Sequence, residues 1–119
     1  MLKQKAQNIL VGCLVAGSVV AVGSTATAQV MTAGVILEKM EDRELAGYIG
    51  GIVEGLAYAR FRKDTIAAGS KDERGSSCIY NWYYTNNDQP AGILATFRKY
   101  PDQMPATIIA LMVKQECGE

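Results

Sequence analysis

Few side chains in this chain of 119 residues are of the types that carry out catalysis. The sequence has no histidine, which is the most common general base in enzymes. It also lacks a nucleophile elbow and a phosphate-binding glycine loop. The acidic residues that cluster near expected helix ends complement the helix dipole and are interpreted as a solvated face; they are Glu38, Glu41, Asp42 and Glu44. We therefore expect no enzymatic activity and no cofactor.

The side chains best suited to binding form the aromatic group that follows Cys78, which consists of Tyr80, Trp82, Tyr83 and Tyr84. Residues 78–88 read CIYNWYYTNND, and tyrosine and tryptophan combine a large rigid face with a polar group, which suits protein interfaces and sugar stacking. A small domain also needs large side chains for its core, and we assign Trp82 to it. Tyr83 and Tyr84 stay open between the core and a surface contact. Together with Glu54 in the second expected helix, they are the candidate partner-binding residues.

The first 28 residues have the pattern of a secretory signal peptide. Lys3 and Lys5 precede the apolar run ILVGCLVAGSVVAVG, and the small residues of STATA suit signal peptidase. We place the cleavage between Ala28 and Gln29, which predicts a periplasmic protein. The alternative is a lipobox in LVGC that would lipidate Cys13, but most of the apolar run would then follow the cut.

Two cysteines, Cys78 and Cys117, remain after the signal peptide and allow a single intramolecular pairing. The exported setting is oxidising, and a domain of this size is close to the lower limit that a hydrophobic core stabilises alone. A bridge that closes about 40 residues would stabilise the fold by roughly 3–4 kcal/mol. Because histidine and a Cys-x-x-Cys motif are absent, a metal or redox role has little support. We predict a structural disulfide.

Charge and length restrict the class of partner. Loss of Lys3 and Lys5 leaves ten basic and twelve acidic residues, a net charge of −2. Such a balance argues against nucleic acid, which requires a basic surface. After residue 29 no apolar run reaches the 18 residues that a membrane span needs. We expect residues 29–119 to form a single domain that binds a protein partner.

The helical spacing of apolar residues predicts an all-α fold, a small bundle of four or five helices closed by one disulfide. A short helix is expected over 32–40. Asp42 is expected to cap a second helix that ends near residue 63 or 68, and its buried stripe consists of Leu45, Tyr48, Ile49, Ile52 and Leu56. Residues 69–77 have the composition of a solvated loop, and a short helix is expected after Cys78.

Two further helices complete the expected bundle. Asn87 or Asp88 caps the first of them, which has Pro90 in its first turn. Its predicted buried face consists of Ile93, Leu94, Phe97 and Tyr100. Pro105 begins the last helix, and Gly118 is placed to end it.

The second expected helix contains four glycines in LAGYIGGIVEGLAYAR, residues 45–60. Gly47, Gly51 and Gly55 recur every fourth residue and Gly50 is added, at a total cost of roughly 3–4 kcal/mol relative to alanine. We expect the recurring glycines to form a ridge that packs against another helix of the domain. The alternative is a groove or a homodimer contact. Packing predicts that Gly51→Leu, unlike Gly50→Ala, lowers the melting temperature by many degrees.

The order of these motifs resembles the Rap/Tai family of periplasmic immunity proteins. The segment GYIGGIVEGL is followed by a cysteine, then by a helix ending in FRKYPDQMP, and then by ATIIALMVKQEC. The resemblance covers roughly residues 45–118, and its scaffold positions are Gly47, Tyr48, Gly51, Cys78, Tyr100, Pro101 and Cys117. The chain departs from the family in lacking a further cysteine pair near the second helix and in the longer segment IYNWYYTNND.

Membership would imply a small helical protein that binds and blocks a cell-wall amidase effector of a type VI secretion system. Because blocking residues are specific to each pair, the resemblance assigns none here. The second hypothesis is a periplasmic stress chaperone similar to the HdeA family, which is also small, helical and closed by one disulfide. A chaperone of that type would open partly near pH 2–3, where the carboxylates lose their charge.

Overall fold

The computed structural model describes residue 23 and residues 29–119, and within these residues all regular structure is helical. The all-α prediction is therefore confirmed for the described part of the chain. The expected signal peptide, with Cys13 and Ala28, lies outside these residues except for Gly23. No described helix is long and apolar enough to cross a membrane.

The first two helices begin close to the predicted positions. Helix α1 spans Ala33–Lys39, and the Thr32 hydroxyl accepts a hydrogen bond from the Val35 N–H. Helix α2 spans Asp42–Ala68, but it is capped by Glu41 rather than Asp42. The Glu41 N–H donates to the Glu44 carboxylate, which therefore accepts a backbone donor that the helix leaves free. Gly69 ends α2 in a left-handed conformation that glycine adopts without strain.

The segment after α2 is more helical than its composition predicts. Helix α3 spans Arg74–Tyr80 and continues into the π-helical turn η1, Asn81–Thr85. The loop is therefore limited to residues 69–73 instead of 69–77. The Asp72 carboxylate accepts the Arg74 N–H at the first residue of α3, which stabilises the helix start as a capping residue does.

The last two helices begin and end close to the positions predicted from the sequence. Helix α4 spans Gln89–Lys99 and helix α5 spans Pro105–Cys117, each with proline in its first turn. Asp88 precedes α4, as predicted, and Gly118 follows α5. Ile93 and Phe97 are fully buried, but Tyr100 is exposed and does not belong to the buried face. Tyr100 lies one residue beyond α4, so the helical spacing no longer sets its direction.

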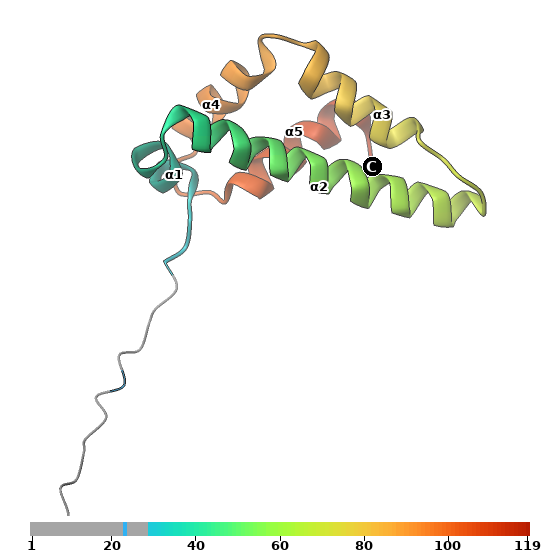
Figure 1. Cartoon of the computed structure of the whole chain (residues 1–119), viewed down its shortest axis with the longest axis horizontal. Helices are drawn as coiled ribbons and strands as arrows, with labels where there is room; N and C mark the ends of the chain where they lie inside the picture. Colours follow the sequence, from blue (N-terminus) through green and yellow to red (C-terminus); the bar gives the residue numbers. More distant parts are fainter. Residues whose placement is uncertain (1–22, 24–28) are drawn as a thin grey trace, which may run out of the picture.

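Figure 1 shows α2 as the long element along which the other helices are arranged. The chain turns at one end of α2, and α3 returns beside it, while α5 packs against both. At the other end, α1 packs against α4. The N–H groups of Ala33 and Gly34 donate to the carbonyls of Gln103 and Pro101, so the start of α1 is bonded to the connection between α4 and α5.

The core draws apolar side chains from α1 to α5. A Cβ atom on Gly34 would lie 3.0 Å from the Pro101 Cβ, which explains why α1 can approach that loop so closely. Along α2 the buried residues are spaced four apart, as expected for one helical stripe. The fully or nearly fully buried apolar residues are Ala33, Ile36, Leu45, Ile49, Val53, Ala57, Ile79, Ile93, Phe97, Ile108, Ile109 and Val113.

The predicted disulfide between Cys78 and Cys117 is confirmed, with Cα atoms 5.8 Å apart. It joins α3 to the last residue of α5 across 39 positions of sequence. The bridge therefore fixes the direction of α3, which leads directly into the aromatic segment η1.

Candidate functional site

The glycine stripe (Gly47, Gly51 and Gly55) lies on the exposed face of α2. A Cβ atom built on any of these residues, or on Gly50, would meet no atom within 4 Å. The expectation that the stripe packs against another helix is therefore wrong for the described part of the chain. Because the buried stripe of α2 is centred on Ile49 and Val53, residues offset by about half a turn from it face outward.

Glu54 borders the glycine stripe and receives two phenol groups. The Tyr80 hydroxyl donates to one carboxylate oxygen of Glu54 at 3.0 Å, and the Tyr84 hydroxyl donates to the other at 2.8 Å. The two tyrosine rings stack with centroids 6.1 Å apart and an interplanar angle of 26°. We call Glu54, Tyr80 and Tyr84 the Glu54 cluster. The structure thus brings together two candidates, Glu54 and Tyr84, that are 30 positions apart.

Tyr83 and Trp82 lie on the core side of the same segment. Both are half-buried and pack against the hydrophobic core, so Trp82 contacts the core, as assigned, without being one of its buried residues. The ring of Tyr83 meets the ring of Tyr84 edge to face at 4.8 Å, a favoured aromatic geometry. Tyr83 therefore packs against both the core and the Tyr84 ring.

Contact with Glu54 changes the acidity of both phenols. Loss of the Tyr84 proton would break its hydrogen bond and place a second negative charge beside the carboxylate, which raises the pKa of Tyr84 to about 12. The hydrogen bond to Glu54 likewise raises the pKa of Tyr80. For Tyr83 the cause is burial, which also raises its pKa. The phenols therefore stay neutral hydrogen-bond donors over the whole physiological range.

Tyr80 belongs to the aromatic group that the sequence offers for binding, but it was not selected as a candidate partner-binding residue. Tyr80 and Tyr84 are four positions apart in continuous helix, which places them on one face, and this spacing was the available signal. The hydrogen bonds to Glu54 depend on how α3 and η1 pack against α2, and sequence spacing does not show this packing. The π-helical turn begins directly after Tyr80, and such turns change the direction of the side chains that follow.

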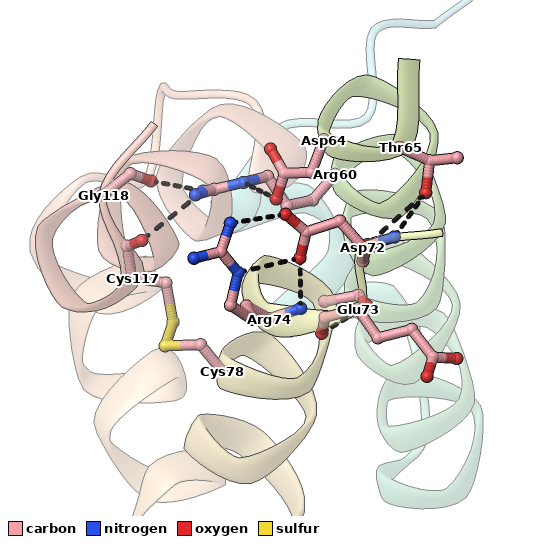
Figure 2. Close-up of polar contacts among 10 residues, drawn as sticks. Arg60, Asp64, Thr65, Asp72, Glu73, Arg74, Cys78, Cys117 and Gly118 are labelled. Atoms are coloured by element: carbon pink, nitrogen blue, oxygen red, sulfur yellow. Dashed lines mark hydrogen bonds and ion pairs between the residues drawn. A yellow bond between two sulfur atoms is a disulfide. The ribbon is translucent and has the colours of Figure 1, made fainter. Parts of the chain in front are cut away.

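A second polar cluster, which we call the Arg60 network, lies beside the disulfide (Figure 2). The Arg60 guanidinium donates to the Asp64 carboxylate at 2.8 Å and to the Gly118 carbonyl at 3.0 Å. It also reaches the Cys117 carbonyl, and these two carbonyls belong to the end of α5, where a cation is favourable. The network therefore ties α2 to the end of α5.

Arg74 and Asp72 form the other half of the Arg60 network. The Arg74 guanidinium holds the Asp72 carboxylate with two hydrogen bonds of 3.0 and 2.6 Å. These bonds and the Arg74 N–H lower the pKa of Asp72 to about 2. A depression of about 560 Å³ is lined by these four charged side chains and the disulfide. Since each guanidinium is already bonded to a carboxylate, the depression offers little to an external anion, and we interpret it as structural.

Comparison with known proteins assigns no family. Neither a protein-family model, a curated protein nor a solved structure matches this chain. In the described residues no three side chains of the metal-binding types gather where they could hold an ion. The chemistry that the site offers is thus a carboxylate and two aromatic rings at the edge of a bare helix surface, an arrangement suited to binding.

Proposed function

We propose that this chain is a non-catalytic periplasmic binding protein of the Rap/Tai immunity type that inhibits a peptidoglycan amidase effector of a type VI secretion system. The fold is consistent with this proposal. The resemblance implies a small helical protein with a disulfide, and the described residues form five α-helices, of which α3 and α5 are joined by the Cys78–Cys117 bridge. Since one fold hosts many functions, the argument for binding has to come from a surface.

The observation that carries the proposal is the exposed glycine stripe. Glycines inside a helix cost about 0.8–1 kcal/mol each relative to alanine, and no packing in the described part of the chain offsets this cost. A partner that lies directly on the backbone of α2 would offset it, because a glycine surface permits an approach that any side chain would block. The stripe is therefore best explained as a surface for another molecule.

The residues beside the stripe have the composition of a protein interface. Tyr58 and Tyr84 are both more than half exposed, and Tyr80 is 37% exposed. Tyrosine is enriched among the residues that dominate binding energy in interfaces, because a large area is buried at a small entropic cost. The Glu54 cluster adds a charged group held in one position. These features favour a protein partner over a small molecule.

The test is capture of the partner in the native periplasm. The tagged mature protein is exported, crosslinked and purified, and the proteins that accompany it are identified by mass spectrometry. We expect one stoichiometric cell-wall hydrolase. A broad set of unfolded clients that grows as the pH falls would instead indicate the HdeA-like chaperone. Full resistance to sister-cell attack after deletion of the gene would contradict the immunity role.

A pair of matched variants tests whether the stripe is the surface used. Gly51→Gln and Gly92→Gln each add the same side chain at an exposed helical glycine with no atom within 4 Å, so both proteins should fold. Gly51→Gln should reduce capture of the partner by about tenfold or more, since it fills the closest part of the interface. Gly92→Gln on α4 should have no effect. Equal capture by the two variants would exclude the stripe.

A further inference from the structure

The Glu54 carboxylate is held in one position before any partner arrives. Each of its oxygens accepts one phenol hydrogen bond, from Tyr80 and from Tyr84 respectively. Hydrogen bonds to both oxygens restrict rotation of the side chain, which lowers the entropy lost when a ligand binds. A carboxylate oxygen has two lone pairs, so each oxygen can still accept another donor.

The surroundings of Glu54 leave it accessible to a cation from outside. The ion pairs in the described residues join other side chains, and none of them uses Glu54. Among its neighbours along the exposed face of α2, Gly50, Gly51 and Gly55 have no side chain that could cover it. An approaching positive group would therefore meet the carboxylate without displacing a salt bridge of the protein.

The two tyrosine rings favour the same kind of ligand. A cation within about 6 Å of an aromatic ring centre is attracted to its face, with roughly 0.5–1 kcal/mol gained at exposed sites. The rings of Tyr80 and Tyr84 stack on each other next to the Glu54 carboxylate, and the two residues are 37% and 54% exposed. A positive group that reaches from Glu54 to the outer face of either ring would gain from both, whereas a negative group would be repelled by both.

We propose that the Glu54 cluster is a receptor for one cationic side chain, arginine or lysine, that a protein partner presents across the glycine stripe. The inference rests on the proposed function and adds the chemistry of the partner. The net charge of −2 expected for residues 29–119 also favours a partner with a basic surface. The phenols contribute as neutral donors that keep the carboxylate in place and as ring faces for the cation.

The cation site can be tested without knowing the partner. The disulfide-bonded mature protein is titrated with the peptide acetyl-Gly-Arg-Gly-amide while the tyrosine ring resonances are followed by NMR. The matched probe carries citrulline in place of arginine, which keeps the shape and removes the charge. We expect saturable shifts of the Tyr80 and Tyr84 rings with arginine and at least about fivefold weaker binding with citrulline.

Two variants locate the effect on the cluster. Glu54→Gln removes the charge but keeps an oxygen that can accept hydrogen bonds from the phenols. It should therefore lower the affinity for the arginine peptide by about fivefold or more. Glu38→Gln removes an exposed charge from α1 and should change nothing. Equal binding of the arginine and citrulline peptides, or unchanged binding by Glu54→Gln, would overturn the inference.

The same variant separates this inference from the proposed function. If the parent protein captures a stoichiometric partner and Glu54→Gln captures it equally well, the partner does not use the cation site, and the inference is overturned while the proposed function stands. If no partner is captured, the proposed function is overturned, and the peptide titration still decides whether the cluster binds a cation. Peptide-independent shifts that grow with protein concentration would show a second copy on this surface and overturn the inference.

Discussion

The Tyr84 hydroxyl donates a hydrogen bond to the Glu54 carboxylate, and this contact sets the pH at which the phenol ionises. With a pKa of about 12, against an ordinary value of 10.0, Tyr84 should ionise about two pH units later than an exposed tyrosine. Because the folded state holds this proton more tightly, the contact stabilises the fold fully below pH 10 and loses its effect as the pH rises through 12. Titration of phenolate absorbance in the folded protein would check this.

Glu54→Gln provides the control for that titration. The variant removes the negative charge and should return the Tyr84 pKa toward 10, while Tyr83, whose pKa is raised by burial, should titrate as before. If the late tyrosine were unchanged in Glu54→Gln, the hydrogen bond between Tyr84 and Glu54 would not be its cause.

Gly75 is a position where a single methyl group should disturb the Arg60 network. A Cβ atom there would lie 2.5 Å from the Arg60 Nε and 2.7 Å from its Cγ, and it would also meet the Asp64 carboxylate. Both side chains would have to move, which would weaken the Arg60 bonds to the end of α5. We predict that Gly75→Ala lowers the free energy of unfolding by about 1–3 kcal/mol, measured by urea denaturation.

Gly92→Ala is the comparison for Gly75→Ala. Gly92 also lies in a helix, but a Cβ atom there meets no atom within 4 Å. The alanine should therefore be neutral or stabilising by up to about 1 kcal/mol. Equal destabilisation by both substitutions would mean that the contacts of Gly75 are not responsible.

At the scale of the helix, α2 should become more stable when its exposed glycines are replaced. Since a Cβ atom at Gly51 enters open space, Gly51→Ala should raise the free energy of unfolding by about 0.5–1 kcal/mol. Gly51→Leu should likewise fold normally, contrary to the expectation from the spacing alone. Thermal unfolding of both variants checks this, and a melting temperature lowered by many degrees would restore the packing hypothesis.

The elements that the sequence predicted best are those with local signals. Pro90 and Pro105 mark helix starts through their own geometry. The sequence leaves the end of α2 open between residues 63 and 68, and the structure places it at Ala68, before the left-handed Gly69. The start of α3 was missed because Gly75 and Ser76 suit a loop by composition. In the fold both residues are buried, and Gly75 lies against Arg60 and Asp64. A tertiary contact of this kind leaves no periodic pattern.

The candidate site was predicted in its parts but not in its assembly. Residue type singled out Tyr84, because tyrosine is enriched in interfaces, and Glu54 was noted as the acid that interrupts the apolar run of the second expected helix. Their hydrogen bond depends on the packing of α3 against α2, and so does the role of Tyr80. The glycine spacing correctly indicated one face of α2, but spacing cannot say whether a face meets another helix or solvent.

For the whole molecule, the disulfide and the Arg60 network act on the same junction. Cys78 and Cys117 link α3 to the end of α5 covalently, and Arg60 links α2 to the carbonyls of Cys117 and Gly118. Three helices thus meet at one end of the bundle. Because η1 continues directly from α3, the position of the Glu54 cluster depends on this junction.

Reduction of the disulfide should therefore weaken the fold as a whole. Closing a loop of about 40 residues contributes roughly 3–4 kcal/mol, which corresponds to a fall in melting temperature of about 10–30 °C for a domain of this size. Thermal unfolding before and after reduction and alkylation measures the fall. An unchanged melting temperature would show that the helices hold this junction without the bridge.

Arg60→Gln, combined with reduction, separates the two ties at this junction. In the oxidised protein the bridge still holds the end of α5, so loss of the Arg60 bonds should have a modest effect. In the reduced protein the end of α5 has lost its covalent link to α3, so loss of the Arg60 bonds to it should cost about 1–2 kcal/mol more. Additive effects would mean that the two ties stabilise α5 independently. A larger effect after reduction would mean that either one alone keeps α3 and η1 in the position that forms the Glu54 cluster.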